Sequence, residues 1–579
     1  MRTILKYILP YKKLAILAPF LMLIEASSEL IMPKLMTLLI HNGVTAGNTN
    51  YILKIGISMI IVAVLGIIGG IGCLIAASVV SQKAGTDLRN DLFTKIQAFS
   101  FHNIDTFQTP SLITRLTNDI TQIQMVILMS LRMLIRAPML CFGSLIMAFT
   151  IHVKLAFIFV IAVVVLSLAT VLIMKKAMPK FQMVQEKLDD VNLVMRECLS
   201  GMRVVKAFVR HEYEIEKFDT VNEAYKTTGM NAFRIVILML PAMMLILNTS
   251  IIAILWNGGI EVSIGTLKIE EIMAFITYLV QMVLAVMMLA MVFMYISRAE
   301  VSISRVHEVL NADIDIVDPL QPISPEKEEG GIKFENVSFR YQGGTGDPVL
   351  ENIHFEIKAG ETVGILGETG SGKSTLVNLI PRLYDVTEGS ISIDGVDVRQ
   401  YAIRELRRHV SVVLQDTILF TGTVRDNIKW GKKDATEDDV VSAAKAAQAH
   451  DFILELPNGY DTELGQKGVN VSGGQKQRIS IARALIQNPS ILIFDDSTSA
   501  VDSLTEKRIR QSLREFHSSC TKIIIAQRIS SVKDADTIFV LKNGRIAAQG
   551  NHKKLMETSL DYQEIFQSQM RKGVIVDGE

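Results

Sequence analysis

The first half of the chain consists largely of long apolar stretches separated by polar segments. A helix of about 20 apolar residues spans a bilayer core of about 30 Å. Stretches of that length lie at approximately 14–41, 53–80, 126–150, 153–175, 233–257 and 269–296. The pattern therefore predicts an α-helical membrane domain with six spans.

The positions of lysine and arginine predict how these spans are oriented. The connection at 41–51 has neither residue, and the one at 257–269 has only Lys268. The N-terminus and the long second and fourth connections are rich in both. Because basic loops favour the cytoplasmic side, we expect both termini to be cytoplasmic in a multi-pass protein of the cell (inner or plasma) membrane.

Two of the connections have the character of helices rather than loops. Residues 82–99 and 187–218 show helical periodicity and mixed charge, which predicts helices that continue beyond the membrane. Short turn-bearing segments follow them at 103–111 and 201–210, where the membrane domain could touch a cytoplasmic domain. Plain solvated loops are the alternative.

Beyond the last span, the composition becomes that of a soluble domain. Residues 311–331 are polar, contain Pro319, Pro322 and Pro325, and lack apolar periodicity, as is typical of a linker. We therefore expect a transmembrane domain at 1–310, a linker at 311–331 and a second domain at 332–579.

A phosphate-binding loop follows the apolar run 362–366. The sequence fits G-x-x-x-x-G-K-[ST] and leads into a helix-forming run, which is the context that a P-loop requires. Its amides would surround phosphate oxygens, Lys373 would reach the β- and γ-phosphates, and Ser374 would bind Mg²⁺. A glycine-rich surface turn is the weaker alternative. The predicted nucleotide-binding residues here are Gly367, Glu368, Thr369, Gly370, Ser371, Gly372, Lys373, Ser374 and Thr375.

Two acidic residues end a later apolar strand. The run Ile491–Phe494 is followed by Asp495, placed to hold Mg²⁺, and by Asp496, placed to orient or deprotonate the attacking water. Tyr341 precedes the P-loop and could stack on an adenine, although a core or edge tyrosine is equally consistent with the residues alone.

Between these motifs lies Ser472, Gly473, Gly474 and Gln475, at the expected start of a helix. This run resembles the signature motif of the ATP-binding cassette family. The resemblance extends over nearly the whole chain and implies an exporter half-transporter, with six spans followed by a P-loop α/β domain that has an antiparallel β subdomain and a helical subdomain. In that family, two subunits sandwich two ATP molecules, and each signature motif faces the other subunit's P-loop.

The resemblance assigns further roles by position. It implies that Gln415 is the glutamine that senses Mg²⁺, that Asp502 belongs to the D-loop 499–502, and that Tyr341 stacks on adenine. It also implies that 103–111 and 201–210 are the two coupling helices. Mg²⁺ ligands would be Ser374, Gln415 and Asp495, and the catalytic positions would be Asp496, Gln527 and Gln415.

Two of these catalytic positions depart from the family pattern. Asp496 stands where glutamate is usual, so its carboxylate lies about 1.5 Å further back. A displacement of a catalytic group by about 1 Å can lower the reaction rate about 10²-fold. Gln527 stands where histidine is usual, and an amide carries no charge and shuttles no proton. The two departures predict a site that binds ATP and hydrolyses it slowly.

Charge, cysteines and the membrane half narrow the possible ligands. Lys plus Arg and Asp plus Glu each number 59, which gives no indication of nucleic-acid binding, and four scattered cysteines show no metal spacing.

Arg132 and Arg136 lie one turn apart and could meet Glu25 or Glu29, meet anionic cargo, or snorkel. Adaptable methionines could line a cavity or simply pack: Met239, Met243, Met244, Met282, Met287, Met288 and Met291.

Together these features predict an ATP-hydrolysing translocase that exports hydrophobic or amphipathic compounds, of the multidrug type. The resemblance is to the degenerate-site subunit of bacterial heterodimeric exporters, with ATP, Mg²⁺, a second half-transporter and the bilayer as partners. A homodimer, a lipid floppase and an ATP-sensing regulatory subunit are the alternatives.

Overall fold

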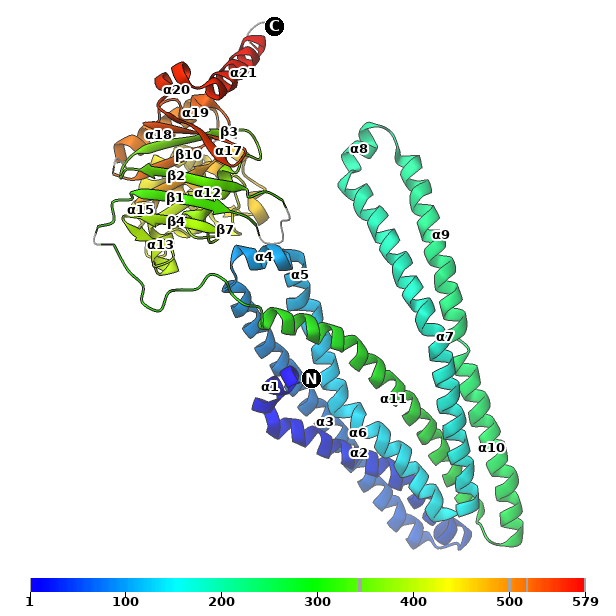
Figure 1. Cartoon of the computed structure of the whole chain (residues 1–579). Helices are drawn as coiled ribbons and strands as arrows, with labels where there is room; N and C mark the ends of the chain where they lie inside the picture. The colour runs from blue at the N-terminus through cyan, green and yellow to red at the C-terminus, as the bar shows by residue number, and fades with distance from the viewer. Residues whose placement is uncertain (1, 326, 342–345, 498–500, 517–518, 577–579) are drawn as a thin grey trace. The chain divides into compact units, whose positions relative to one another are not determined.

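The computed structural model describes all residues except 1, 326, 342–345, 498–500, 517–518 and 577–579. It divides into two compact units. The helical unit contains residues 1–97 and 110–311, and the α/β unit contains residues 98–109 and 312–579. Each unit is described by itself (Figure 1).

The helical unit is built from long helices joined by short turns. Six of its segments are long and apolar enough to cross a membrane, which confirms the predicted number of spans: Ile4–Thr45, Thr49–Gln97, Thr109–Ile151, Val153–Ser200, His211–Ile264 and Ile269–Leu289. The helices are α1 (Arg2–Ile8), α2 (Lys12–Leu39), α3 (Thr49–Gln97), α5 (Thr109–Thr114), α6 (Ile120–Ile151), α7 (Val153–Ser200), α8 (Met202–Ala207), α9 (His211–Val236), α10 (Met239–Ile264) and α11 (Ile269–Leu310).

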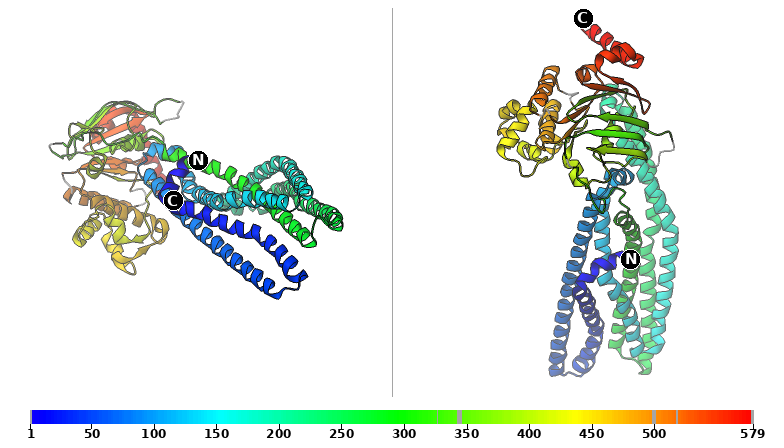
Figure 2. Two further views of the ribbon diagram at one scale, coloured as in Figure 1. Left: turned by 90° about the horizontal axis from the view of Figure 1, so that it is seen from below. Right: turned by 60° about the vertical axis from the view of Figure 1, so that its left-hand side comes forward.

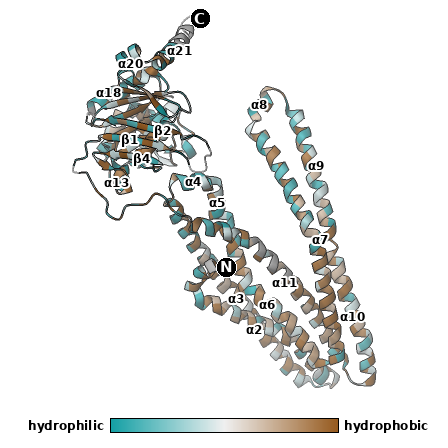
Figure 3. Ribbon diagram, viewed as in Figure 1, coloured by the Kyte–Doolittle hydropathy of each residue, from teal (hydrophilic) through white to brown (hydrophobic). Residues whose placement is uncertain are grey.

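Several of these helices are much longer than a bilayer is thick. At a rise of 1.5 Å per residue, the 49 residues of α3 extend about 70 Å, against about 30 Å for the hydrocarbon core. Hydropathy follows this division, because α10 and the adjoining part of α7 are mostly apolar whereas α9 is mostly polar (Figure 3). The short helix α8 lies at the far end of the α7–α9 hairpin in each view (Figures 1 and 2).

Helices α2 and α3 pack closely because of a small residue at their crossing. A Cβ on Gly69 would lie 2.8 Å from the Leu21 carbonyl oxygen and 3.1 Å from the Glu25 amide nitrogen. Glycine is therefore needed for the two backbones to approach this closely. Ala18, Met22 and Cys73 are fully buried in the adjoining cluster.

The α/β unit contains a six-stranded sheet in the order β12-β11-β3-β10-β9-β6 and a four-stranded antiparallel sheet in the order β2-β1-β4-β5. Strands β11, β3, β10, β9 and β6 are parallel, and β12 is antiparallel at one edge. The strands are β1 (Ile332–Phe339), β2 (Leu350–Ile357), β3 (Thr362–Gly367), β4 (Glu388–Ile393), β5 (Val396–Asp397), β6 (Val410–Val413), β7 (Gly422–Thr423), β8 (Glu463–Leu464), β9 (Ile491–Asp495), β10 (Thr521–Ile525), β11 (Thr537–Lys542) and β12 (Arg545–Gly550).

Helices accompany both sheets and form a separate cluster. A contiguous core within that cluster includes Val440, Ile453 and Ile479, so the predicted helical subdomain is confirmed together with the antiparallel one. The helices are α4 (Phe101–Phe107), α12 (Lys373–Leu379), α13 (Ile403–His409), α14 (Val424–Lys429), α15 (Glu437–Ala446), α16 (His450–Glu455), α17 (Gly473–Leu485), α18 (Ser503–Phe516), α19 (Ile529–Val532), α20 (His552–Thr558) and α21 (Leu560–Val576).

The parallel strands determine where the candidate site forms. Strands β3 and β9 flank β10, and their carboxyl ends lie at the same edge of the sheet. In open α/β sheets, ligands bind at this edge. The P-loop after β3 and the acidic pair at the end of β9 are therefore brought together although they are far apart in sequence.

Candidate nucleotide-binding site

The P-loop between β3 and α12 adopts a backbone that requires glycine. Gly370 and Gly372 have φ angles of +85° and +99°, which L side chains rarely adopt. A Cβ on Gly372 would also lie 2.9 Å from Leu350 Cδ2. The loop closes around Lys373, whose ammonium group donates to the carbonyl oxygens of Gly367 (2.9 Å) and Glu368 (2.7 Å).

Burial and charge act in opposite directions on the groups around this lysine. Burial lowers the pKa of Lys373, and the Asp496 and Asp495 carboxylates oppose that shift. Ser374 Oγ donates to Asp495 Oδ1 at 2.9 Å. Burial raises the pKa of Asp495, while the Ser374 bond lowers it. A serine hydroxyl and a carboxylate oxygen in contact are oxygen ligands of the kind that Mg²⁺ takes.

The site fits a nucleoside triphosphate with Mg²⁺ on the evidence of its own groups. Among the described residues, Lys373 is hydrogen-bonded only to neutral carbonyls, so its charge is available to phosphate oxygens. Ser371 Oγ is buried without a hydrogen-bond partner among the described residues, and it lies in the loop that would surround the phosphates. Asp495 and Ser374 would hold the metal, which would neutralise phosphate charge.

Asp496 and Gln527 contact each other at the two positions that depart from the family pattern. Gln527 Nε2 donates to Asp496 Oδ2 at 3.1 Å. Asp496 has a φ of +45°, and its amide donates to the Ile525 carbonyl at the end of β10. Burial raises the pKa of Asp496, whereas Lys373, Arg528 and the Gln527 bond lower it.

The loop that carries Gln527 is held by a residue that the sequence analysis missed. Gln569 on α21 donates to the Gln527 carbonyl at 2.7 Å and accepts from the Ile529 amide at 2.9 Å. A glutamine in a polar C-terminal helix belongs to no motif and lies 42 residues from its partner, so no pattern indicated it.

Tyr341 lies beside the P-loop helix. Its hydroxyl is 3.1 Å from Thr375 Oγ1, and its side chain remains partly exposed. Its ring is perpendicular to that of Tyr384, with centroids 5.3 Å apart. An exposed ring held edge-on by a second ring can offer its face to a nucleobase.

Tyr384 connects this aromatic group to helix α4, within the α/β unit. Its hydroxyl donates to Asp105 at 2.7 Å, and its ring lies 6.1 Å from that of Phe101. Asn103 donates to the Asp313 carbonyl at 3.0 Å, which holds α4 to the following chain as well. The sequence analysis predicted contact for 103–111 but did not identify Tyr384 as its receiving residue.

The signature residues form the first turn of α17. Ser472 Oγ accepts from the Gln475 amide (3.3 Å), and Gln475 Oε1 accepts from the Ser472 amide (2.8 Å), so the two form a capping box. Gly473 and Gly474 follow in the exposed turn. Among the described residues, no hydrogen bond joins this turn to the P-loop, and Ser472 is exposed.

The remaining positions that were predicted lie at exposed ends of elements. Gln415 follows β6 and is exposed. Asp502 precedes α18 and accepts from the Thr505 amide at 2.9 Å, a bond that holds its pKa below the usual value. Ser499 and Ala500 of the expected D-loop lie outside the described residues.

In the helical unit, Arg136 meets the predicted carboxylates. It pairs with Glu25 and, at 2.9 Å, with Glu29. The methionines that line the adjoining cavity are Met32, Met36 and Met59. None of the methionines named from sequence lines it, and Met282 is fully buried instead.

Comparison with known proteins agrees with this architecture. Residues 15–286 match the ABC transporter transmembrane region and residues 350–499 match the ABC transporter domain. The chain is 40% identical to the uncharacterized ABC transporter ATP-binding protein YfiB of Bacillus subtilis over 98% of both chains. It is 36% identical to an ATP-dependent lipid A-core flippase of Syntrophus aciditrophicus, over 86% of this chain and 82% of the relative.

A solved structure extends the likeness to the whole fold. A bacterial Atm1-family ABC exporter with ATP bound matches with a TM-score of 0.80 and 27% identity, covering 96% of this chain and 98% of that one. The chain therefore belongs to the ABC transporter family. It is a multi-pass membrane protein with the half-transporter architecture of an exporter, a class that couples ATP hydrolysis to translocation and works as a dimer.

Proposed function

We propose that this chain is the degenerate-site subunit of a heterodimeric exporter for hydrophobic or amphipathic compounds. The contact between Asp496 and Gln527 carries the proposal. The remaining ATP-site groups, Lys373, Ser374 and Asp495, have the arrangement that binding requires. The site then binds Mg·ATP and hydrolyses it slowly.

The chemistry of the pair explains the slow step. A general base needs reach and proton affinity, and Asp496 is one methylene short while one of its oxygens accepts from Gln527. Gln527 cannot take up a proton or present a positive charge to the γ-phosphate. The nucleotide therefore serves mainly to hold the two subunits together.

The signature turn of this chain supplies the partner's site. Ser472 is exposed and sits with the amides behind it at the N-terminus of the 13-residue helix α17, which suits a second subunit's γ-phosphate. The partner would contribute the P-loop, a glutamate and a histidine to that site. Turnover then depends on this chain's Ser472 more than on its Asp496.

Exposed apolar residues on α8 and directly after it support assembly with a second subunit. Val204, Phe208 and Val209 are 60%, 75% and 71% exposed at the end of the long hairpin. The α/β unit has a complementary cavity of about 520 Å³, whose lining includes the exposed Phe420 and Trp430, stacked 4.4 Å apart. We infer that α8 docks into the corresponding groove of the partner, on the side that we expect to be cytoplasmic.

There are three alternatives, and one of them has specific support. The name of the flippase relative favours a lipid floppase of the same architecture, which an ATP-dependent flipping assay with labelled lipids distinguishes. A homodimer would pair two impaired sites. A purely ATP-sensing subunit would leave transport intact when this chain's spans are disabled.

The test compares the purified chain alone with its complex with a second half-transporter that carries the glutamate and the histidine. In nanodiscs, we expect the chain alone to bind ATP but to hydrolyse it about 10²-fold more slowly than the complex does. Equal turnover by the chain alone would contradict the proposal.

A further inference from the structure

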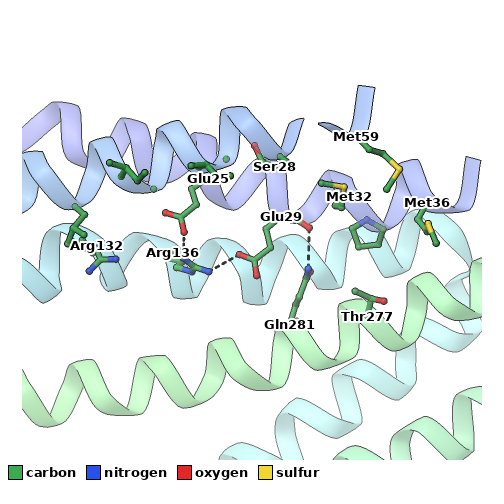
Figure 4. Close-up of a pocket in the computed structure, with 17 residues that line it drawn as sticks. Glu25, Ser28, Glu29, Met32, Met36, Met59, Arg132, Arg136, Thr277 and Gln281 are labelled. Atoms are coloured by element: carbon green, nitrogen blue, oxygen red, sulfur yellow. Dashed lines mark hydrogen bonds and ion pairs between the residues drawn. The ribbon is translucent and has the colours of Figure 1, made fainter. Parts of the chain in front are cut away.

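The helical unit contains a cavity of about 800 Å³ between α2, α3, α6 and α11. Charged residues gather at one end of it and methionines at the other (Figure 4). Arg136 lies 15 residues, roughly 22 Å along the helix, from the nearer end of α6, and Glu29 lies 10 residues, roughly 15 Å, from the nearer end of α2. Ionisable groups at such depth are costly unless they have a function.

Arg136 pairs with carboxylates through both of its terminal nitrogens, while its Nε is buried without a hydrogen-bond partner among the described residues. It projects from α6 between Glu25 and Glu29 of α2, and pairs with both. The three side chains together carry one negative charge in excess. Gln281 of α11 donates to the Glu29 carbonyl at 3.1 Å and closes the opposite wall.

Other polar atoms in the same cavity lack partners. Arg132, one turn from Arg136, forms no ion pair with any carboxylate in the described part of the chain and hydrogen-bonds instead to the Cys73 thiol. Glu25 Oε2, Arg132 Nε and Gln281 Oε1 are buried and have no hydrogen-bond partner among the described residues. Leaving buried polar atoms unsatisfied is costly, so a cation without a carboxylate and a free acceptor both favour a ligand.

The far end of the cavity suits an apolar chain. Met32, Met36 and Met59 line it. Flexible thioether side chains adapt to varied apolar shapes. The cavity is therefore amphipathic along its length.

Helix α3 leaves room for the Glu25 carboxylate. A Cβ on Gly70 would lie 3.1 Å from both Glu25 Cδ and Glu25 Oε2. That spacing is tighter than ordinary contact, so a side chain here would displace the carboxylate toward the cavity centre. Gly70 thus helps to position Glu25 without touching a ligand.

From these groups we propose that the cavity binds amphiphiles whose polar head carries both a primary ammonium group and an acidic group. The ammonium donates to Glu25 and Glu29, the acid pairs with Arg132, and the apolar chain lies along the methionines. A purely cationic head leaves Arg132 uncompensated, and a purely anionic head lies beside the excess negative charge. The charged residues of the lining have a net charge of zero. A zwitterionic ligand leaves the net charge of the occupied cavity at zero within the membrane. That this ligand is cargo rests on the proposed export function.

The head chemistry could come from a phospholipid or from an amino-acid amphiphile, and the test includes both. Probes of matched chain length are dodecylphosphoethanolamine, 2-aminododecanoic acid, dodecyl phosphate and dodecylammonium. Binding of each is measured to the full chain in phosphatidylcholine nanodiscs without ATP. Phosphatidylcholine is a suitable background because its quaternary ammonium donates no hydrogen bond.

We expect at least one zwitterionic probe to bind at least ten-fold more tightly than both single-charge probes. The tighter of the two zwitterions identifies the source. Arg132→Gln should lower the affinity for that zwitterion to the affinity for dodecylammonium. Glu29→Gln should lower it to the affinity for dodecyl phosphate. Gly70→Ala, which retains every charge, should weaken it several-fold.

Equal binding of all probes by the unaltered chain, or tightest binding of a single-charge probe, would overturn the proposal without reliance on any variant. Because the assay uses no ATP, this result is independent of the hydrolysis assay. The exporter assignment can therefore stand if the ligand proposal fails, and the reverse also holds.

Discussion

Gln527 donates a hydrogen bond of 3.1 Å to Asp496, so the two residues at the positions of the usual catalytic pair contact each other. The amide binds a carboxylate oxygen that a base would need to present to water. At the same time, Lys373 and the Ser374–Asp495 pair are arranged for binding. These contacts support the proposal that binding and hydrolysis are separable in this site.

Restoring the usual residues should restore hydrolysis. In a complex whose partner glutamate is silenced, we expect Asp496→Glu with Gln527→His to raise turnover about 10-fold to 10²-fold, because the carboxylate advances by about 1.5 Å and a base is regained. Phosphate release in proteoliposomes measures this. Turnover that stays at the silenced level would show that other groups limit the step.

The signature serine should matter to the partner's site. We expect Ser472→Ala to lower turnover of the complex about ten-fold, since it removes a hydroxyl aimed at the second nucleotide. Thr436→Ala is the matched control, because Thr436 forms the same kind of capping box on α15. Both variants lose a cap that contributes about 1 kcal/mol, and only the first should lose activity. An equal loss in both would assign Ser472 a structural role alone.

Tyr384 should couple α4 to the nucleotide site. Tyr384→Phe keeps the ring contacts but removes the bond to Asp105, a contribution of about 1 kcal/mol. We expect basal ATP turnover to stay within about twofold, while stimulation by transported compound falls about five-fold. Burial and Asp105 raise the pKa of Tyr384, so the hydroxyl stays a donor and the effect should be constant from pH 6 to 9.

The control for this variant removes a tyrosine hydroxyl elsewhere in the same unit. Tyr401 donates to the Ile393 carbonyl at 2.9 Å in the core. Tyr401→Phe should leave stimulation unchanged. Loss of stimulation in both variants would attribute the effect to general destabilisation.

The apolar end of α8 should be needed for coupling. Phe208→Asp places a charge on a side chain that is 75% exposed, so folding of the chain should be unaffected. We expect transport to fall at least ten-fold while ATP binding persists, as measured by uptake into inverted vesicles. Ile215→Asp makes the same change on α9 at 57% exposure, and transport by that variant should remain. Normal transport with Phe208→Asp would exclude α8 as a docking element.

The sequence predicted the architecture well because its signals are local. Apolar runs identify spans, and the glycines with Lys373 identify a P-loop wherever they occur after a strand. The partner of Arg136 was left open, because carboxylates, cargo and snorkelling were all compatible with a basic residue in a span. Its pairing with Glu25 and Glu29 depends on how α2 and α6 are rotated, which packing decides.

Tyr384, Asp105 and Gln569 were not predicted for a similar reason. Their contacts join residues 279 and 42 positions apart, and single tyrosines, aspartates and glutamines occur throughout soluble domains. The cavity methionines were not identified, because composition points to methionine-rich spans and left lining and packing open, whereas the lining depends on which face of α2 and α3 meets the cavity.

The most direct test of the account compares two substitutions in the assembled complex. Asp496→Asn in this chain and Glu→Gln at the corresponding position of the partner are each assayed for steady-state ATP turnover in the same proteoliposomes. We expect the first to leave turnover within about twofold of the unaltered complex, and the second to lower it about 10²-fold or more. Equal losses from both substitutions would contradict the claim that this chain's site binds ATP but contributes little hydrolysis.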